Sequence, residues 1–369
     1  MSSFSTLSLL PTLLESLDAL GFSQQTEIQA QTLPALLEDR SLVGVSETGS
    51  GKTLAYVLPM LHKLKNLELR GSSVSETRHP RGLVLVPGRE LGEQVSKVFK
   101  SMTHKTRVRV RTALGGSKKK VTRQSVSGTF EILVATPGRL SQLVNGGEVN
   151  LEDVRTLVFD EADQMLDPSF LPVAKAIIRA CPKNVQLVMF SATLPGGLET
   201  VVHEVFPNTP LVIRTRGSQR VVPTLQTIHT QISSHLRFET LVETLAQAPD
   251  VATMAFVNTR DQLEKLGKYL TSEGISFTSY RGQMDRQERR TNLARFRNGE
   301  VSLLLATDLG GRGLDIEGVD RVINVHLPQT LDNYLHRVGR TARAGRKGLV
   351  VNLVTQRDHP LIAKLDKRA

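Results

Sequence analysis

Short runs of apolar residues alternate along the chain with longer stretches in which apolar residues recur every three or four positions. In the first half, the runs lie at residues 42–45, 83–86, 132–135, 157–160 and 186–190. The stretches between them have the periodicity of amphipathic helices. Apolar strands that alternate with such helices are typical of strand-helix-strand units, which build a parallel sheet covered on both faces. The pattern therefore predicts an α/β fold.

A second series of apolar runs follows in the other half of the chain. Its members lie at residues 253–257, 277–280, 303–306, 322–325 and 349–353. The segment between the two series begins Arg-Thr-Arg-Gly-Ser-Gln-Arg and is polar, basic and aperiodic, so we place an interdomain linker at residues 214–223. The pattern thus predicts two domains, at residues 1–213 and 224–369. Residues 71–81 are also polar and predict a surface loop in the first domain.

A glycine-rich turn, Ser46-Glu47-Thr48-Gly49-Ser50-Gly51-Lys52-Thr53, follows the first predicted strand and opens a helix. Gly49 and Gly51 let backbone amides approach a phosphate closely, Lys52 can reach the β- and γ-phosphates, and the Thr53 hydroxyl can bind Mg²⁺. The general phosphate-loop pattern has a glycine at the position of Ser46, so the match departs at one residue. One apolar stripe marks the helix that follows: Leu54, Val57, Leu58, Leu61 and Leu64.

Acidic residues follow another predicted strand. Asp160, Glu161 and Asp163 come directly after the apolar run Leu157-Val158-Phe159. In open α/β sheets the carboxyl ends of the strands form the edge where ligands bind. Asp160 can hold Mg²⁺ there, and Glu161 can orient a water molecule. Together with the glycine-rich turn, these carboxylates predict a nucleotide-hydrolysing site.

Composition restricts the partners and the compartment. The 369 residues fit two domains better than one. A net charge of +11 favours an anionic partner without proving one, since a mildly basic surface is often only solvated. The single cysteine, Cys181, excludes an internal disulfide and a cysteine-based zinc cluster, and we expect it to be buried. Neither a basic leader nor a membrane-length apolar run is present, which predicts a soluble protein of the cytoplasm, or of the nucleus if the source has one.

Residues 21–29 complete a resemblance that covers essentially the whole chain. The sequence resembles the DEAD-box ATP-dependent RNA helicases, because Gly21, Phe22, Thr26, Ile28 and Gln29 are similar to the adenine-reading Q motif of that family. A glutamine amide can both donate to and accept from the adenine edge. The family resemblance implies two tandem RecA-like domains, each a parallel sheet flanked by helices. It also implies ATP contacts at Phe4, as an upstream stacking aromatic, Phe22, Gln29, Thr48, Gly49, Ser50, Gly51, Lys52, Thr53 and Asp315.

Other segments resemble the RNA-contacting elements of the family. One segment contains Pro87, Arg89, Glu90, Leu91 and Gln94. The resemblance implies contacts with the sugar-phosphate backbone rather than with bases. Base stacking should contribute little, since the chain has no tryptophan and only 4% aromatic residues. The implied RNA contacts are Arg89, Gly115, Gly116, Thr136, Pro137, Gly138, Arg139 and Thr307.

Two further segments resemble elements that couple ATP to RNA. The resemblance implies that the hydroxyls of Ser191 and Thr193 bond Asp163 and link hydrolysis to strand separation. The run Tyr-Leu-His-Arg-Val-Gly-Arg-Thr-Ala-Arg at residues 334–343 resembles the arginine-finger segment. Arg340 and Arg343 would face the γ-phosphate there. The implied catalytic residues are Lys52, Asp160, Glu161, His336, Arg340 and Arg343.

Several positions depart from the family pattern without removing a catalytic group. They are Gln25 for proline, Ser46, Gly92 and Gly310 for alanine, Gly88 for threonine, Arg286 for glutamine, His326 for aspartate and Ala342 for glycine. We expect Gly88 and Arg286 to affect RNA grip or coupling between the domains more than ATP binding.

The resemblance implies an RNA-stimulated ATPase that uses ATP and Mg²⁺, acts as a monomer and unwinds or remodels short RNA duplexes and ribonucleoprotein complexes. An ATP-gated RNA clamp or scaffold with little unwinding activity would have the same site residues. A DNA helicase of the same superfamily is a third alternative, which the Q motif and the sequence Asp-Glu-Ala-Asp at residues 160–163 disfavour.

Overall fold

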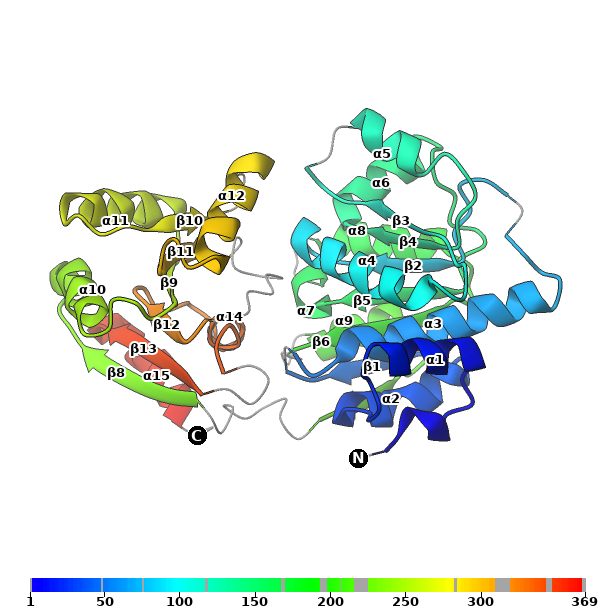
Figure 1. The fold of residues 1–369 in the computed structure, drawn as a ribbon, viewed down its shortest axis with the longest axis horizontal. Coiled ribbons are helices and arrows are strands. Elements are labelled where there is room, and N and C mark those ends of the chain that lie inside the picture. The colour runs from blue at the N-terminus through cyan, green and yellow to red at the C-terminus, as the bar shows by residue number, and fades with distance from the viewer. Residues whose placement is uncertain are drawn as a thin grey trace. The chain divides into compact units, whose positions relative to one another are not determined.

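The chain divides into two compact units, residues 1–218 and 219–369 (Figure 1). This division falls inside the range predicted for the linker, residues 214–223. The computed structural model describes residues 2–47, 49–74, 76–116, 119–166, 170–192, 198–206, 208–215, 225–281, 284–308, 319–342 and 347–366. Most of the predicted linker therefore lies outside the described residues, and its bounds stay a prediction.

A parallel sheet forms the centre of the first unit, with the strand order β3-β4-β2-β5-β6-β1-β7. Every neighbouring pair of these strands is parallel. The strands are β1 (Leu42–Val45), β2 (Gly82–Leu85), β3 (Val110–Ala113), β4 (Ile132–Ala135), β5 (Thr156–Asp160), β6 (Gln186–Ser191) and β7 (Leu211–Arg214).

Helices cover both faces of this sheet (Figure 1). One face packs against η1 (Phe4–Thr6), α1 (Pro11–Ala19), α2 (Glu27–Leu37), α3 (Lys52–Leu69) and α4 (Arg89–Thr103). The other packs against α6 (Pro137–Asn145), α7 (Ala162–Met165), α8 (Leu171–Ala180) and α9 (Leu198–Val205), while α5 (Lys119–Ser125) follows β3. Leu83 and Val84, neighbours in β2, belong to opposite core clusters. Burial on both faces explains why the central strands are continuous apolar runs.

The second unit repeats this plan with the strand order β10-β11-β9-β12-β13-β8, again parallel throughout. Its strands are β8 (Leu225–Gln231), β9 (Thr253–Val257), β10 (Thr278–Tyr280), β11 (Leu303–Thr307), β12 (Arg321–Asn324) and β13 (Gly348–Val354). One face packs on α10 (Arg237–Ala246) and α11 (Arg260–Ser272), the other on α12 (Arg286–Arg297), α14 (Leu331–Val338) and α15 (His359–Asp366). Two short 3₁₀ turns, η3 (Ser234–Leu236) and η4 (Gln356–Asp358), precede α10 and α15.

The predicted strands are all present, each within one residue at either end. The strands that the pattern missed among the described residues are β3, β7 and β8, and each forms an edge of its sheet. The predicted apolar stripe of α3 is buried, and so is Cys181. Residues 71–81 lie outside helices and strands wherever they are described. Within the described part of the chain, no helix has both the length and the apolar character that crossing a bilayer requires.

At Gly44 the strand β1 lies very close to a side chain of β6. A Cβ atom at Gly44 would lie 2.5 Å from Cε1 of Phe190. We expect Gly44→Ala to lower the free energy of unfolding by about 1–3 kcal/mol, because overpacking displaces the buried Phe190 ring. Chemical denaturation followed by circular dichroism measures the loss. Gly128→Ala is the matched control, since a Cβ atom there meets no atom within 4 Å. Equal stability of the two variants would contradict the prediction.

Candidate active site

The strand order separates the predicted site residues of the first unit into two groups. The first group lies at the carboxyl ends of the neighbouring strands β5, β6 and β1. Asp160 ends β5, Ser191 ends β6, and the glycine-rich turn follows β1. The segments that follow β3, β4 and β2 carry Gly115, Thr136 and Arg89. Along the sequence the second group lies between the glycine-rich turn and Asp160 of the first, but the sheet places each group on adjacent strands. Because all strands are parallel, both groups lie on the side of the sheet where the strands have their carboxyl ends.

The glycine-rich turn adopts the conformation that its glycines allow. Gly49 and Gly51 have positive φ angles of 84° and 90°, and Gly51 is the N-cap of α3. A Cβ atom at Gly51 would lie 2.5 Å from Nε2 of Gln29. The turn therefore leads into the amino end of a long helix, where free N–H groups and the helix dipole favour a phosphate. Thr48 lies outside the described residues.

Lys52 is held inside this turn. Its Nζ donates hydrogen bonds to the carbonyl oxygens of Ser46 and Glu47, at 2.7 Å each. Burial lowers the pKa of Lys52, and the nearby carboxylates, with Asp160 the largest contributor, oppose this shift. The ammonium group is thus positioned between the backbone of the turn and the acidic residues of β5.

Asp160 ends β5 as a buried carboxylate, 3% exposed. Burial, and then the charge of Glu161, raise its pKa to about 6, while Lys52 acts in the opposite direction. A buried carboxylate of this kind gains from a nearby cation. Among the described residues no group of three or more His, Cys, Asp or Glu could hold a metal ion. The single buried carboxylate of Asp160 fits Mg²⁺, which commonly takes one or two protein oxygens and completes its shell with phosphates and water.

Glu161 has an unusual backbone conformation, with φ at 57° in the left-handed region. Such a conformation costs energy in a residue other than glycine, and it is concentrated at functional sites. The side-chain amide of Gln164 donates a hydrogen bond to Glu161 Oε2. The backbone N–H of Gln164 donates to Oδ1 of Asp163 at 3.0 Å. Both carboxylates after Asp160 are therefore oriented by one residue that no sequence motif indicated.

The Q motif contacts the glycine-rich turn directly. Oε1 of Gln29 accepts a hydrogen bond from the Thr26 N–H at 2.9 Å, and its Nε2 donates to the Gly51 carbonyl at 3.0 Å. One N–H and one lone pair of the amide remain for an adenine edge. Phe4 is 3% exposed and packs in the core of the first unit, so its stacking on adenine stays a prediction. Phe22 is 44% exposed and offers the open ring face that stacking requires.

Two departures from the family pattern have hydrogen-bonded roles here. The Gln25 N–H donates to the Ser2 carbonyl at 2.8 Å, a bond that proline could not make. The hydroxyl of Thr215, which directly follows β7, donates to the Ser46 hydroxyl at 2.9 Å, and both residues are buried. Alanine at position 46 could not accept that bond. Each departure therefore adds a hydrogen bond between a segment of the candidate nucleotide site and a residue near one end of the first unit.

The predicted RNA-contacting elements of the first unit are joined by hydrogen bonds. Nη1 of Arg89 donates to the Gly115 carbonyl at 3.1 Å, and the Gly115 N–H donates to the Thr136 hydroxyl at 3.1 Å. Pro137 occupies the first turn of α6, where a missing N–H costs nothing. The space around Gly88 is open, since a Cβ atom added there would lie 3.9 Å from its nearest neighbour, Glu90 Oε2.

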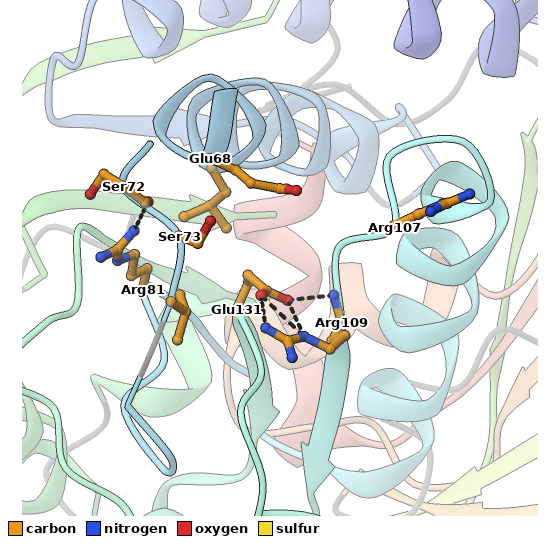
Figure 2. Close-up of a pocket in the computed structure, with 9 residues that line it drawn as sticks. Glu68, Ser72, Ser73, Arg81, Arg107, Arg109 and Glu131 are labelled. Atoms are coloured by element: carbon orange, nitrogen blue, oxygen red, sulfur yellow. Dashed lines mark hydrogen bonds and ion pairs between the residues drawn. The ribbon is translucent and has the colours of Figure 1, made fainter. Parts of the chain in front are cut away.

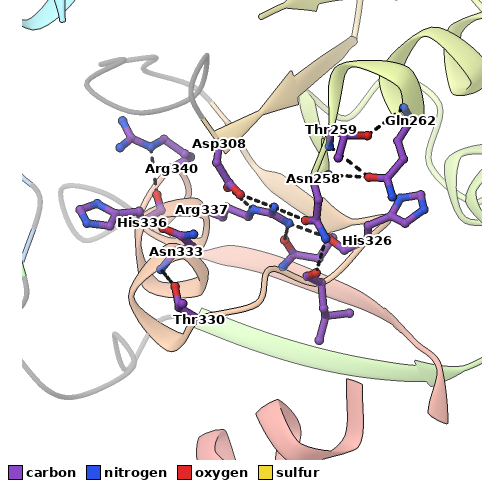
Figure 3. A network of polar contacts seen from close by, with 12 residues as sticks. Asn258, Thr259, Gln262, Asp308, His326, Thr330, Asn333, His336, Arg337 and Arg340 are labelled. Carbon is purple, nitrogen blue, oxygen red and sulfur yellow. Dashed lines mark hydrogen bonds and ion pairs between the residues drawn. The ribbon is translucent and has the colours of Figure 1, made fainter. Parts of the chain in front are cut away.

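In the second unit the central polar residue is Arg337, which is 1% exposed (Figure 3). Its five N–H groups donate to five acceptors, so every donor is satisfied. Its guanidinium also lies over the Phe256 ring, 5.2 Å from the centroid. The acceptors are both carboxylate oxygens of Asp308, the side-chain oxygens of Asn258 and Asn324, and the His326 carbonyl. No sequence pattern had indicated a role for Arg337.

The predicted catalytic and RNA residues of the second unit lie next to this network. Thr307 ends β11 and immediately precedes Asp308. Nε of Arg340 donates to the His336 carbonyl at 3.1 Å, and Arg340 is buried (Figure 3). Arg337 therefore fixes the segment from which Arg340 extends. Arg343, Asp315 and Thr193 lie outside the described residues, as does the side chain of Arg286.

The first unit has a cavity of about 270 Å³ at the amino ends of β2, β3 and β4 (Figure 2). The predicted site residues of this unit lie at the carboxyl ends of the strands. Arg109 forms an ion pair with Glu131 there, and Arg81 forms one with Asp153. Arg107 also lines the cavity but points away from its centre in Figure 2. These paired charges stabilise the loops before β2, β3 and β4, and the cavity is not part of the predicted site.

A parallel sheet with a phosphate loop after one strand and paired carboxylates after another defines a class of protein, the phosphate-loop nucleotide hydrolases. Comparison with known proteins gives the family. The DEAD/DEAH box helicase family matches residues 26–201, and the helicase conserved C-terminal domain matches residues 236–345.

Individual relatives and a solved structure support the same family. The DEAD-box ATP-dependent RNA helicase CshA of Geobacillus kaustophilus is 33% identical over 359 residues, 97% of this chain and 74% of that protein. RhpA of Helicobacter pylori, also a DEAD-box ATP-dependent RNA helicase, is 32% identical over 99% of this chain and 72% of its own length. The structure of S. cerevisiae Dbp5 bound to RNA and ADP BeF3 aligns with a TM-score of 0.88 at 29% identity, covering 100% of this chain and 93% of that one. The chain belongs to the DEAD-box ATP-dependent RNA helicase family.

The Arg337 network predicts a large loss of stability when its geometry is broken. We expect Arg337→Lys to lower the free energy of unfolding by about 3 kcal/mol, because lysine has too few donors for the buried acceptors around Asp308. Urea denaturation, with hydrogen exchange of peptides from β9 and β11, measures the loss and places it in the second unit. Arg260→Lys, in the exposed pair with Glu264, is the control and should change little. A similar small effect at Arg337 would contradict the prediction.

His326 predicts a pH-dependent contribution to stability. Burial lowers its pKa from 6.5 to about 4, and the charges of Arg237 and Arg337 act in the same direction while Asp358 opposes them. His326 therefore binds a proton at higher pH in the unfolded chain than in the folded one. Its contribution to the free energy of unfolding is complete above pH 6.5 and is lost as the pH falls towards 4. We expect His326→Asn to remove as much as about 3 kcal/mol of the acid-dependent loss.

The measurement is denaturation of the wild type and the variant at several pH values between 6.5 and 4. His359→Asn, at an exposed histidine of the same unit, should retain the acid-dependent loss of the wild type. Parallel pH profiles for the wild type and His326→Asn would show that His326 makes no such contribution.

Proposed function

We propose that this chain couples RNA-stimulated ATP hydrolysis to local unwinding or remodelling of short RNA duplexes and ribonucleoprotein complexes. The observation that carries the proposal is the sheet order of the first unit. It brings β1, which the glycine-rich turn follows, and β5, which Asp160 ends, to the two sides of β6. The segments of Arg89, Gly115 and Thr136 follow strands of the same sheet at their carboxyl ends. Relatives named ATP-dependent RNA helicases and the RNA-bound structure of Dbp5 support the same function.

In this proposal the first unit binds ATP and Mg²⁺. Backbone amides of the glycine-rich turn and the ammonium of Lys52 hold the phosphates. Thr53 and Asp160 would hold Mg²⁺, which would supply positive charge next to the phosphates. Glu161 orients the attacking water and accepts its proton. The hydrogen bond from Gln164 supports this role, because it fixes the Glu161 carboxylate.

RNA binding is assigned to Arg89, Gly115, Gly116, Thr307 and the amino end of α6, residues 136–139. Backbone amides, helix amino ends and arginines suit phosphates and carry little base preference. The joined hydrogen bonds of Arg89, Gly115 and Thr136 support one continuous contact surface in the first unit. We therefore expect largely sequence-independent recognition of the RNA backbone.

The second unit supplies the remaining catalytic groups in this proposal. Arg340 and Arg343 stabilise the transferring phosphoryl group, as arginine fingers do, and Asp315 binds the ribose. Ser191 and Thr193, with Asp163, couple hydrolysis to RNA separation. Because the catalytic residues are divided between two units, hydrolysis requires both, which makes it dependent on RNA. The domain limits 1–213 and 224–369, and a cytoplasmic monomer, remain predictions.

Steady-state ATPase activity of the purified chain, with and without single-stranded RNA, tests this proposal. We expect RNA to stimulate turnover strongly, and Glu161→Gln to lower kcat at least about 100-fold. Nucleotide binding should persist in the variant, because the amide keeps the size of the carboxylate. Glu152→Gln, at an exposed carboxylate before β5, is the matched control and should retain activity. Substantial turnover in Glu161→Gln would refute the assigned role.

Strand displacement on short RNA duplexes separates unwinding from clamping. A helicase releases single strands in an ATP-dependent way, whereas a clamp binds RNA with ATP and releases little. Single-stranded DNA in the ATPase assay separates the third alternative, since equal stimulation by DNA and RNA would indicate a DNA helicase of the same superfamily.

A further inference from the structure

Tyr56 contributes a buried hydroxyl to the nucleotide site. It lies in the first turns of α3, three residues after Thr53 and four after Lys52, so the three side chains share one side of the helix. The Tyr56 side chain is 1% exposed, and its ring packs against Phe99 and Phe190 at centroid distances of 6.4 and 5.8 Å. These contacts fix the ring and hence the position of its hydroxyl.

The hydroxyl bonds one of the two residues proposed to hold Mg²⁺. It donates a hydrogen bond to Oδ2 of Asp160 at 2.8 Å. The other residue, Thr53, precedes Tyr56 by three positions on α3, a spacing that places the two side chains next to each other on the helix surface. Tyr56 thus links α3, which carries Thr53, to the Asp160 carboxylate at the end of β5.

The Asp160 carboxylate is held at both of its oxygens. While Tyr56 binds Oδ2, the backbone N–H of Glu161 donates to Oδ1 at 3.1 Å. Two donors on different oxygens prevent the carboxylate from rotating about its Cβ–Cγ bond. The lone pairs that remain on each oxygen then keep a fixed direction. Hydrogen-bond partners of this kind orient metal ligands, and their removal commonly weakens metal binding about 10- to 100-fold.

We propose that Tyr56 is a positioning residue for Mg²⁺, whose hydroxyl fixes the Asp160 carboxylate relative to Thr53. The inference rests on the metal site of the proposed function and extends it to a residue that does not touch the metal. It separates two roles of the side chain, since the ring fills the core and the hydroxyl orients a ligand.

Tyr56→Phe isolates the hydroxyl because it retains the ring. The measurement is the binding of a fluorescent ADP, N-methylanthraniloyl-ADP, over a series of Mg²⁺ concentrations without RNA. We expect the Mg²⁺ concentration for half-maximal tightening to rise about tenfold in the variant. Nucleotide affinity without Mg²⁺ should equal that of the wild type. In the ATPase assay, kcat at saturating Mg²⁺ should be largely restored.

Thr156→Val is the matched control. It removes a buried hydroxyl from the other end of β5, where Thr156 bonds the side chain of Gln186 at 3.1 Å. We expect this variant to lose stability while the Mg²⁺ dependence of nucleotide binding stays that of the wild type. A Mg²⁺ shift in Tyr56→Phe but not in Thr156→Val supports the inference.

Three results would overturn it: a Tyr56→Phe midpoint within about twofold of the wild type, a loss of nucleotide affinity equally large without Mg²⁺, or an equal shift in Thr156→Val. A wild type whose nucleotide binding ignores Mg²⁺ would overturn both the inference and the proposed metal site. Failure of the proposed function differs from these results, because it would appear as Mg²⁺-dependent nucleotide binding without RNA-stimulated ATPase activity.

Discussion

Parallel strand pairing is the constraint on which the rest of the structure depends. Because every strand in a sheet points the same way, all strands end on the same side of the sheet, and the order of the strands decides which of the following residues lie close together. Sequence order would interleave Arg89 and Thr136 between the glycine-rich turn and Asp160. Strand order instead separates them, since β2 and β4 lie on one side of β5 while β6 and β1 lie on the other.

Buried charge has opposite uses in the two units. Arg337 is surrounded by as many acceptors as it has N–H groups, so it has no capacity left for a ligand. Asp160 has a raised pKa despite Lys52 and two hydrogen bonds, and its charged form would gain from another cation. A buried charge whose hydrogen-bonding groups are all occupied, as in Arg337, serves the fold. An incompletely compensated one, at the edge of a sheet and beside a phosphate loop, is typical of a binding site.

The sequence predicted what local pattern determines. Central strands such as β5 are buried on both faces and stand out as apolar runs. In contrast, β3, β7 and β8 lie at the edges of their sheets and contain exposed residues, so local pattern does not distinguish them from loops. Motif spacing likewise predicted roles for Lys52 and Asp160. Tyr56 could not be found in this way, because its partner lies 104 residues away and only the pairing of distant segments joins them. Arg337 was missed for the same reason.

Among the described residues, departures from the family pattern change how the loops are held. At position 326 the usual aspartate would lie near Arg237, but this chain has a histidine whose lowered pKa keeps it neutral at pH 7. A carboxylate is still close, because Arg237 bonds the Thr355 hydroxyl, which in turn donates to Asp358 at 2.7 Å. In this chain a negative charge near Arg237 is therefore supplied by Asp358 of η4. Coulomb attraction to Arg237 requires an opposite charge close by and does not require it at position 326.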